Sequence, residues 1–152
     1  MSWQLIADGS CIGNPGMGGW AFILTDGDVK IVKSGFDVCT TNNRMELQSL
    51  INGLAGFNEL NIDQELVVTM DSQYVLKGIQ TWIHTWKKNN WLTSAKKPVK
   101  NKDLWTILDK QIPNLKLQFD WTKGHNGHVL HDTVDVIARC SASKHQNCVC
   151  PK

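Results

Sequence analysis

This chain of 152 residues lacks the features of secreted, disulfide-rich and membrane-spanning proteins. Its five cysteines are an odd number without framework spacing, which argues against a small disulfide scaffold. No run of about 18 uncharged apolar residues occurs, the length that a transmembrane helix requires. The first residues, MSWQLIADGS, carry neither the basic segment nor the apolar run of a signal peptide. We therefore expect a soluble, cytoplasmic protein that is monomeric and does not contact membranes.

Glutamate is scarce, because only three residues of the chain are Glu. One of them, Glu46, lies in TTNNRMEL (residues 41–48), where a polar stretch leads into a helical pattern. Glu46 follows Asn43 by three residues, which is the spacing of a capping box. Thr41 is an equally plausible helix cap, and a Thr41 cap would leave Glu46 available for another role.

Acidic residues are missing between Asp71 and Asp103, where the chain carries seven lysines: Lys77, Lys87, Lys88, Lys96, Lys97, Lys100 and Lys102. The rest of the chain holds the remaining nine basic residues and all fourteen acidic ones, although the net charge is only +2. One surface is therefore expected to be cationic. With Trp82, Trp86 and Trp91, this segment favours contact with a nucleic-acid backbone. The alternative is a solvated lysine face over core tryptophans.

Hydrophobic patterns predict one α/β domain. Strands are expected at 3–8, 20–26, within 26–38, at 65–71 and at 115–121, and helices at 43–60, 72–83, 102–112 and about 130–141. Turn residues at 13–16 and 26–27 make the first three strands an antiparallel meander. This order predicts a mixed five-stranded sheet with helices on both faces over residues 1–143. Residues 144–152 are expected to form a flexible tail.

Four carboxylates stand at positions where they could meet. Asp8 falls near the end of the first strand and Asp71 ends the buried fourth strand, while Glu46 and Asp135 lie on helices that must pack on the sheet. If those two strands are neighbours, the four carboxylates can share one edge of the sheet. Each also has an ordinary explanation, such as helix capping for Asp71, anchoring of the following turn for Asp8, or solvation for Asp135.

Convergence of these carboxylates would require cations. Two carboxylates about 4 Å apart repel by about 1 kcal/mol in water and by about 4 kcal/mol at an effective dielectric of about 20. An all-oxygen ligand set suits Mg²⁺, with Mn²⁺ as a substitute. Two such ions about 3.5 to 4 Å apart can activate a water and stabilise the leaving oxygen of a phosphodiester. The cluster thus predicts phosphodiester hydrolysis.

The histidines allow two interpretations. His125, His128 and His131 fall three residues apart with Cys140 further along, so a zinc site is conceivable. Gly127 and the uncertain start of the last helix weaken that spacing. His125 on its glycine-bearing loop is better interpreted as a proton-transfer group, because imidazole titrates near neutral pH. An ordinary surface histidine is the remaining alternative.

Six segments of the chain form a distinctive set of motifs, which are, in order, DGSCIGNPGMGGWAFIL, TTNNRMEL, TMDSQYVLKGI, WKKNNW, KKPVKNKDLW and KGHNGHVLHDTVDVIAR. In order and spacing they resemble bacterial type 1 ribonuclease H, and they cover the chain to about Ser143. The resemblance implies a ribonuclease H-like catalytic domain over residues 1–143. It also implies that the RNA strand of an RNA·DNA hybrid is cut to leave 5′-phosphate and 3′-hydroxyl ends, with two Mg²⁺ ions per substrate-loaded site.

The resemblance further implies roles for individual residues. The metal-binding catalytic carboxylates would be Asp8, Glu46, Asp71 and Asp135, with His125 assisting. Residues matching contacts to the hybrid's minor groove are Asn14, Asn42 and Gln73, and those matching a DNA-phosphate pocket are Thr41 and Asn101. Trp82 and the following WKKNNW match a basic handle, and the lysines expected to bind nucleic acid are Lys87, Lys88, Lys96 and Lys97.

The chain departs from the family pattern at two places, one in the last motif and one just before the first aspartate. The family usually shows Asn-Glu where this chain has His131 and Asp132, and Ala7 replaces a common threonine. The ten-residue step from His125 to Asp135 is kept, so Asp135 rather than Asp132 is expected to be the fourth ligand. If the altered motif misplaces Asp135, the chain would be a weakened hybrid-binding module. A related nuclease fold that acts on DNA is a third hypothesis.

Overall fold

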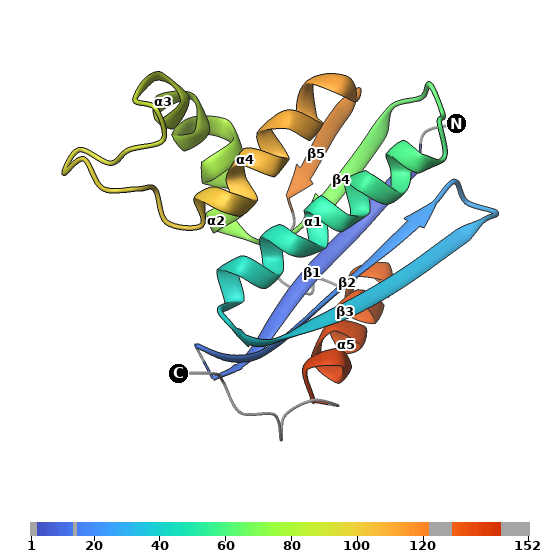
Figure 1. The fold of residues 1–152 in the computed structure, drawn as a ribbon. Coiled ribbons are helices and arrows are strands. Elements are labelled where there is room, and N and C mark those ends of the chain that lie inside the picture. Colours follow the sequence, from blue (N-terminus) through green and yellow to red (C-terminus); the bar gives the residue numbers. More distant parts are fainter. Residues whose placement is uncertain (1–2, 14, 122–128, 144–152) are drawn as a thin grey trace.

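The structure, a computed structural model, describes residues 3–13, 15–121 and 129–143. Its five strands are β1 (Trp3–Gly13), β2 (Gly16–Thr25), β3 (Lys30–Thr40), β4 (Leu66–Met70) and β5 (Leu117–Trp121). The principal helices are α1 (Asn42–Glu59), α2 (Gln73–Lys77), α3 (Ile83–Lys88), α4 (Lys102–Gln111) and α5 (Val129–Ser143). A π-helical turn (Gly78–Trp82) joins α2 to α3, and a 3₁₀ turn (Ile112–Asn114) follows α4 (Figure 1).

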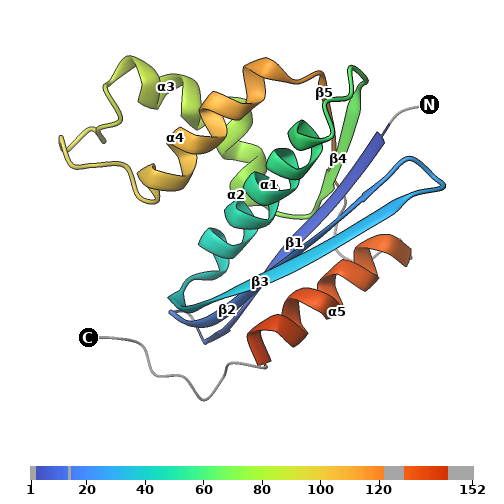
Figure 2. The same cartoon turned by 45° about the vertical axis from the view of Figure 1, so that its right-hand side comes forward.

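The strands form one mixed sheet in the order β3-β2-β1-β4-β5. The first three strands pair antiparallel, whereas β4 pairs in parallel with both β1 and β5. Helix α1 lies on one face of the sheet with α4 beside it, and α5 covers the opposite face (Figures 1 and 2). The predicted five-stranded mixed sheet with helices on both faces is therefore confirmed.

Alternation along β1 explains how both faces acquire a core. Leu5 and Ala7 belong to the larger core under α1, whereas Ile6 belongs to a second cluster with Val134 and Ala138 of α5. Successive side chains of a strand point to opposite faces, so one strand anchors helices on both sides. Because all five of these side chains are completely buried, the helices that carry functional residues are firmly fixed to the sheet.

Two elements differ from the pattern that the sequence predicts. The β1–β2 ladder continues to the pair Gly13↔Gly16, so most of the expected loop between the strands is itself strand. The expected helix at 72–83 extends to Lys88 and contains the π-helical turn. At Gly78 a Cβ atom would lie 2.0 Å from Cη2 of the fully buried Trp105. This close approach of helix and indole therefore depends on the lack of a side chain at Gly78.

None of the described helices combines the length and apolar character needed to cross a membrane.

Candidate active site

Two of the four carboxylates come from the parallel pair β1 and β4. The register pairs Ile6 with Thr69, and continuing it two residues brings Asp8 level with Asp71. Asp8 does not lie near the end of its strand, as the sequence suggested, because β1 runs on to Gly13. The relevant edge is created instead by the end of β4 at Met70, where Asp71 begins a new segment. Ser72 caps α2 by accepting from the Val75 amide at 3.2 Å, so Asp71 is not the helix cap.

Glu46 reaches the same place from the first turns of α1. Thr41 is the N-cap, and its Oγ1 accepts a hydrogen bond from the Arg44 amide at 3.3 Å. The capping alternative for Glu46 is therefore wrong. Glu46 Oε1 instead accepts from the Gly9 amide at 3.2 Å, and the same amide donates to Asp8 Oδ1 at 2.9 Å. One backbone N–H thus holds both carboxylates side by side.

Gly9 permits this arrangement by its lack of a side chain. A Cβ atom here would lie 2.4 Å from the carbonyl carbon of Met45 and 2.5 Å from the amide nitrogen of Glu46. Both are backbone atoms of α1, so they cannot move aside without displacing the helix. The start of α1 and the carboxylate of Glu46 are therefore positioned by glycine in the middle of β1.

We expect Gly9→Ala to lower both stability and activity, because the new methyl group must push α1 away from β1. Overpacking of this kind typically costs about 1 to 3 kcal/mol. Thermal unfolding measures the first effect, and cleavage of a labelled hybrid under conditions where the variant is folded measures the second. Gly56→Ala is the matched control, because a Cβ there would meet its nearest side-chain atoms at 3.4 Å. Wild-type stability and activity of Gly9→Ala would contradict this account.

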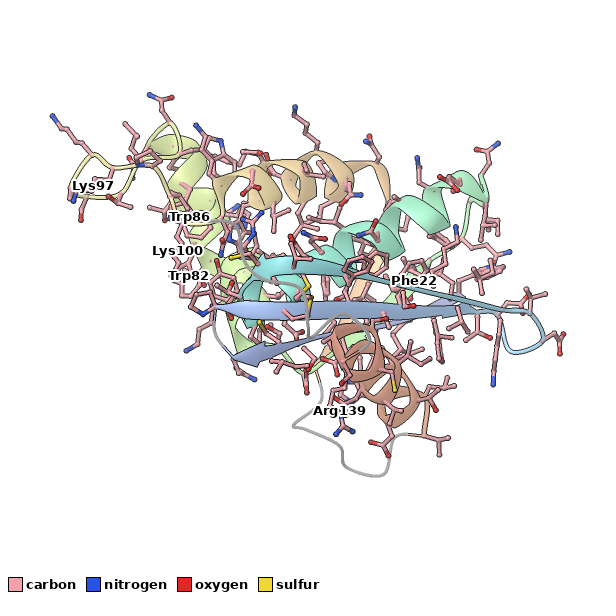
Figure 3. All side chains as sticks on the ribbon, turned by 60° about the horizontal axis from the view of Figure 1, so that its bottom comes forward. Phe22, Trp82, Trp86, Lys97, Lys100 and Arg139 are labelled. Atoms are coloured by element: carbon pink, nitrogen blue, oxygen red, sulfur yellow. The ribbon has the colours of Figure 1, made fainter. Side chains whose placement is uncertain are left out.

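Asp135 approaches from the opposite face of the sheet on α5. Its Oδ2 forms an ion pair with Nη2 of Arg139 at 2.8 Å, one helical turn further on. Asp132 lies elsewhere on α5, beside an apolar hollow lined also by Val136 and Ile137. The structure therefore brings Asp135, rather than Asp132, to the other carboxylates. Arg139 itself is exposed and extends outward from α5 (Figure 3).

The carboxylates line one polar cleft of about 410 Å³. Its lining residues are Asp8, Gly9, Ser10, Asn42, Asn43, Glu46, Asp71, Ser72, Gln73, Tyr74 and Asp135. The four acids come from β1, α1, the segment after β4, and α5. The cleft thus joins residues that lie up to 127 positions apart in the chain.

Burial makes the charged forms of the two deepest acids unfavourable. Asp8 is 3% exposed and Glu46 is 4% exposed. Desolvation, opposed by a hydrogen bond with Glu46 and reinforced by the charges of Asp71 and Asp135, raises the pKa of Asp8 to about 7. Desolvation and then the charge of Asp8 raise the pKa of Glu46 well above its ordinary value. The fold therefore holds Asp8 and Glu46 side by side although burial disfavours a negative charge on either.

The donor atoms of this cleft fit a divalent cation. Carboxylate oxygens of Asp8 and Asp71 lie with a nitrogen of His131 so that all three atoms are within 4.8 Å of one another. Within the described part of the chain, Oε2 of Glu46 is buried without a hydrogen-bond partner. A buried carboxylate oxygen of this kind is costly unless a cation or donor compensates it. The carboxylates, rather than His131, are the ligands that Mg²⁺ prefers.

His131 is the residue that the sequence did not assign to this cleft. The sequence indicates His131 as a member of a conceivable zinc site and as a departure from the family pattern, without a place in the carboxylate cleft. In the structure its side chain is fully buried and its Nε2 lies 3.8 Å from Asp71 Oδ2. Cys140 is exposed further along α5, and His125 and His128 lie outside the described residues. The i, i+4 spacing of His131 and Asp135 was the available signal, since such residues share a helix face.

The residues that match nucleic-acid contacts fall into three places. Asn42 and Gln73 are exposed at the cleft itself. Thr41 and Asn101 lie at the N-termini of α1 and α4, and Arg44 links these ends by donating to Asn101 Oδ1 at 3.2 Å and by a bidentate pair with Asp103. Asn14 lies outside the described residues. The cleft and the phosphate-pocket positions are thus carried by adjacent helix ends.

The lysine-rich segment 77–102, here called the cationic segment, projects from the body through α3 and the connection to α4 (Figures 1 and 3). Lys87, Lys88, Lys96 and Lys97 are all exposed, and Lys87 also pairs with Asp109 at 3.2 Å. The tryptophans at 82, 86 and 91 are half-buried and pack against one another in tilted orientations, with successive ring centroids 5.9 and 6.2 Å apart. They therefore support the projection while leaving part of each ring accessible.

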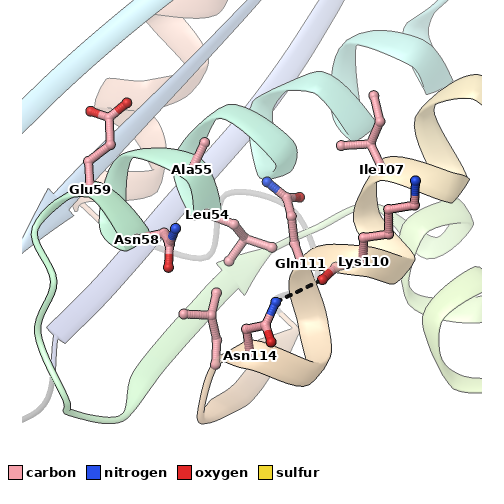
Figure 4. A pocket seen from close by; sticks show the side chains of 9 residues that line it. Leu54, Ala55, Asn58, Glu59, Ile107, Lys110, Gln111 and Asn114 are labelled. Atoms are coloured by element: carbon pink, nitrogen blue, oxygen red, sulfur yellow. Dashed lines mark hydrogen bonds between the residues drawn. The ribbon is translucent and has the colours of Figure 1, made fainter.

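A separate pocket lies between α1 and the end of α4 (Figure 4). Its lining includes Leu54, Ile107 and Leu115, and Asn114 closes one side by donating to the Lys110 carbonyl at 3.2 Å. Glu59 and Lys110 supply its charged side chains. None of the four candidate carboxylates lines this pocket, so it is not part of the candidate active site.

Comparisons with known proteins agree with this fold. A family model described as RNase H matches residues 2–143. Ribonuclease H of Solibacter usitatus is 48% identical over 139 residues, covering 91% of this chain and 93% of that protein. Ribonuclease H of Pseudoalteromonas atlantica is 49% identical over 142 residues, covering 92% and 90%, respectively. Such matches over nearly the whole chain concern the entire domain rather than a local motif.

Solved structures give the same result. LC9-RNase H1, described as a type 1 RNase H with the type 2 active-site motif, has a TM-score of 0.83 and 26% identity, and the match covers 95% of this chain and 73% of that chain. LC11-RNase H1 in complex with an RNA/DNA hybrid has a TM-score of 0.66 at 22% identity, over 94% and 98% of the two chains. The structures share the fold of this chain, and the family model and sequence relatives define it as a nuclease of the hydrolase class. It belongs to the ribonuclease H family.

Proposed function

We propose that this protein hydrolyses the RNA strand of RNA·DNA hybrids with two Mg²⁺ ions held by Asp8, Glu46, Asp71 and Asp135, and that Mn²⁺ can substitute. The observation that carries this proposal is the convergence of four carboxylates from separate elements on one cleft. Relatives of nearly equal length are named ribonuclease H, and LC11-RNase H1 has been solved with a hybrid. Both support the same substrate class.

Each residue of the cleft has a separate role in the proposed reaction. Bound divalent cations would supply activation of a water and stabilisation of the leaving oxygen. Asp8 on β1 and Asp71 just after β4 form the floor of the site, and the Gly9 amide keeps Glu46 beside Asp8. Asp135 closes the site from α5. The products would carry 5′-phosphate and 3′-hydroxyl ends, and His125 is the proposed proton-transfer group.

Substrate binding is proposed to combine the cleft rim with the cationic segment. Asn42 and Gln73 stand where the minor groove of a hybrid would meet the cleft, and a 2′-hydroxyl there would distinguish RNA from DNA. The chain leads directly from Gln73 through α2 to the cationic segment. Thr41 and Asn101 are proposed to receive a phosphate of the DNA strand, and Trp82 is proposed to lie along that strand.

A labelled hybrid incubated with Mg²⁺ tests the function. We expect the RNA strand of the hybrid to be cut, with the DNA strand intact and with no cutting of matched DNA duplex. Hybrid binding without cleavage would contradict the enzyme hypothesis and favour a hybrid-binding module. Equal cutting of the DNA duplex would indicate a nuclease without RNA selectivity. Chelation of the metal is expected to stop the reaction and to leave the protein folded.

Replacing Lys87, Lys88, Lys96 and Lys97 with alanine is expected to raise KM and to weaken the salt dependence of hybrid binding. Each lost phosphate contact should reduce the slope of log affinity against log salt by about 0.7 to 0.9, because fewer counterions are released. Anisotropy titrations across a salt series measure the slope. The matched control replaces four lysines outside the cationic segment, namely Lys30, Lys33, Lys110 and Lys116. An unchanged slope in the first variant would mean that the segment is only solvated.

A further inference from the structure

His131 occupies a position that a purely carboxylate site does not explain. It lies in the first turns of α5, four residues before Asp135, and its side chain has no exposed surface. Its Nε2 is 3.8 Å from Asp71 Oδ2, and one of its nitrogens lies within 4.8 Å of carboxylate oxygens of both Asp8 and Asp71. The imidazole therefore faces the same point as two of the proposed metal ligands.

The packing of α5 directs this side chain toward the carboxylates. Val134 and Ala138, three and seven residues further on, lie on the same helix face and are buried against Ile6 and Ala21 of the sheet. Residues at such spacings share one face of a helix. Contacts between this face and the sheet thus fix the backbone at His131, and the imidazole is held near Asp8 of β1 and Asp71 just after the end of β4.

The distance between His131 and Asp71 is compatible with two ligands of one cation. At 3.8 Å, His131 Nε2 and Asp71 Oδ2 are too far apart for a hydrogen bond. Two ligand atoms about 2.1 Å from one ion lie up to about 4.2 Å apart. The buried Oε2 of Glu46 is a further oxygen donor in the same cleft.

We propose that His131 is a nitrogen ligand of the divalent-cation site, beside Asp8 and Asp71, and that it shifts the site's preference from Mg²⁺ toward Mn²⁺ and later first-row cations. Imidazole favours these ions, whereas Mg²⁺ favours oxygen donors. The inference rests on the proposed function, because it requires that the carboxylate cleft binds a divalent cation. It assigns a chemical consequence to the residue that departs from the usual asparagine of the family.

Electron spin echo envelope modulation of Mn²⁺ bound to the substrate-free protein tests this ligand without measuring activity. We expect modulation from a directly bound imidazole nitrogen in the wild-type protein and its loss in both His131→Asn and His131→Gln. The matched control is His125→Ala, in which the modulation should persist. Calorimetric titrations should show Mn²⁺ affinity falling about tenfold or more in His131→Asn, while Mg²⁺ affinity changes much less. Circular dichroism verifies that each variant is folded.

The outcomes separate this inference from the proposed function. Mn²⁺ binding to the wild-type protein without imidazole modulation would overturn the assignment of His131 and leave the carboxylate site intact. Modulation that disappears in His125→Ala but persists in both His131 variants would overturn it equally. Absence of Mn²⁺ binding to the folded wild-type protein would overturn the proposed metal site and this inference together. One folded His131 variant is sufficient to decide whether the modulation depends on His131. Labelling of the wild-type histidines with ¹⁵N should alter the modulation without any substitution.

Discussion

Asp71→Asn is expected to abolish cleavage of the RNA strand while hybrid binding is preserved. The substitution keeps the size of the side chain but replaces a charged oxygen donor with a neutral amide. Substitution of residues that only orient metal ligands typically lowers metal affinity or activity by about 10- to 100-fold. Because Asp71 is a proposed ligand itself, we expect cleavage activity to fall by more than about a hundredfold. Single-turnover cleavage of a hybrid with a labelled RNA strand measures this loss.

Hybrid affinity provides the internal comparison for Asp71→Asn. Removing one negative charge from the cleft reduces repulsion of the phosphate backbone, so binding should be equal or tighter. The matched control is Asp63→Asn, because Asp63 is exposed, pairs with Lys116 and lies outside the cleft. Wild-type cleavage by Asp71→Asn would refute its proposed role as a metal ligand. Parallel loss of cleavage and binding would show instead that Asp71 supports the binding surface.

Asp8→Asn is expected to change activity and stability in opposite directions. Cleavage should fall by more than about a hundredfold, as for Asp71. The metal-free protein should become more stable at pH 8, because burial and neighbouring acids raise the pKa of Asp8 to about 7. One pKa unit corresponds to about 1.4 kcal/mol, so the gain in unfolding free energy is expected to be roughly 1 to 4 kcal/mol. Denaturant unfolding in a chelating buffer measures it.

The pH dependence of this gain follows from proton linkage. Between the ordinary pKa of 3.8 and the folded-state value of about 7, the folded protein binds more protons at Asp8 than the unfolded chain does. The contribution of Asp8 to stability is therefore fully present below about pH 4 and is lost as the pH rises through about 7. Wild-type and Asp8→Asn stabilities should converge at low pH and diverge toward pH 8. A gap that narrows as the pH rises would contradict the account.

Divalent cations should reverse the penalty. A cation that binds the folded cleft stabilises the wild-type protein by mass action, and it should raise the melting temperature of Asp8→Asn much less. This difference distinguishes a metal site from a buried acidic pair that merely destabilises the fold. The Asp8 carboxylate would then lower the stability of the protein only in the absence of the metal that it is proposed to bind for catalysis.

The elements of the fold could be predicted because local patterns are strong in this sequence. The alternation of Leu5, Ile6 and Ala7 between two cores and the apolar spacing of α1 both follow directly from the side chains. The Thr41 cap was one of two alternatives in the sequence, and only the observed bond to the Arg44 amide decides between them. Short-range chemistry thus gave the elements, whereas their ends required knowledge of contacts.

Features that depend on distant contacts could not be predicted in the same way. Asp8 reaches the edge of the sheet because β4 ends beside the middle of β1, a fact of strand length rather than of the β1 sequence. The close packing of Trp105 on Gly78 comes from another helix. The direction of His131 depends on how α5 docks on the sheet. In each case the deciding partner lies far along the chain.

The cationic segment shows that two opposed interpretations of its tryptophans are compatible. Trp86 packs against the buried Trp105, with ring centroids 5.4 Å apart, and also against Trp82 and Trp91. These rings partly belong to the core, as the structural alternative required. Their remaining exposure beside Lys88 keeps the nucleic-acid hypothesis, and the salt series decides whether the exposed side binds phosphate.

The central claim is that Asp8, Glu46, Asp71 and Asp135 form one divalent-cation site, and anomalous diffraction at the manganese edge tests it most directly. Crystals of the wild-type protein with Mn²⁺ and a hybrid are expected to show anomalous peaks within about 2.5 Å of carboxylate oxygens of Asp8 and Asp71. Two peaks about 3.5 to 4 Å apart are expected when the hybrid occupies the cleft. An ordered carboxylate cleft with no peak, or with peaks only elsewhere on the protein, would contradict the account.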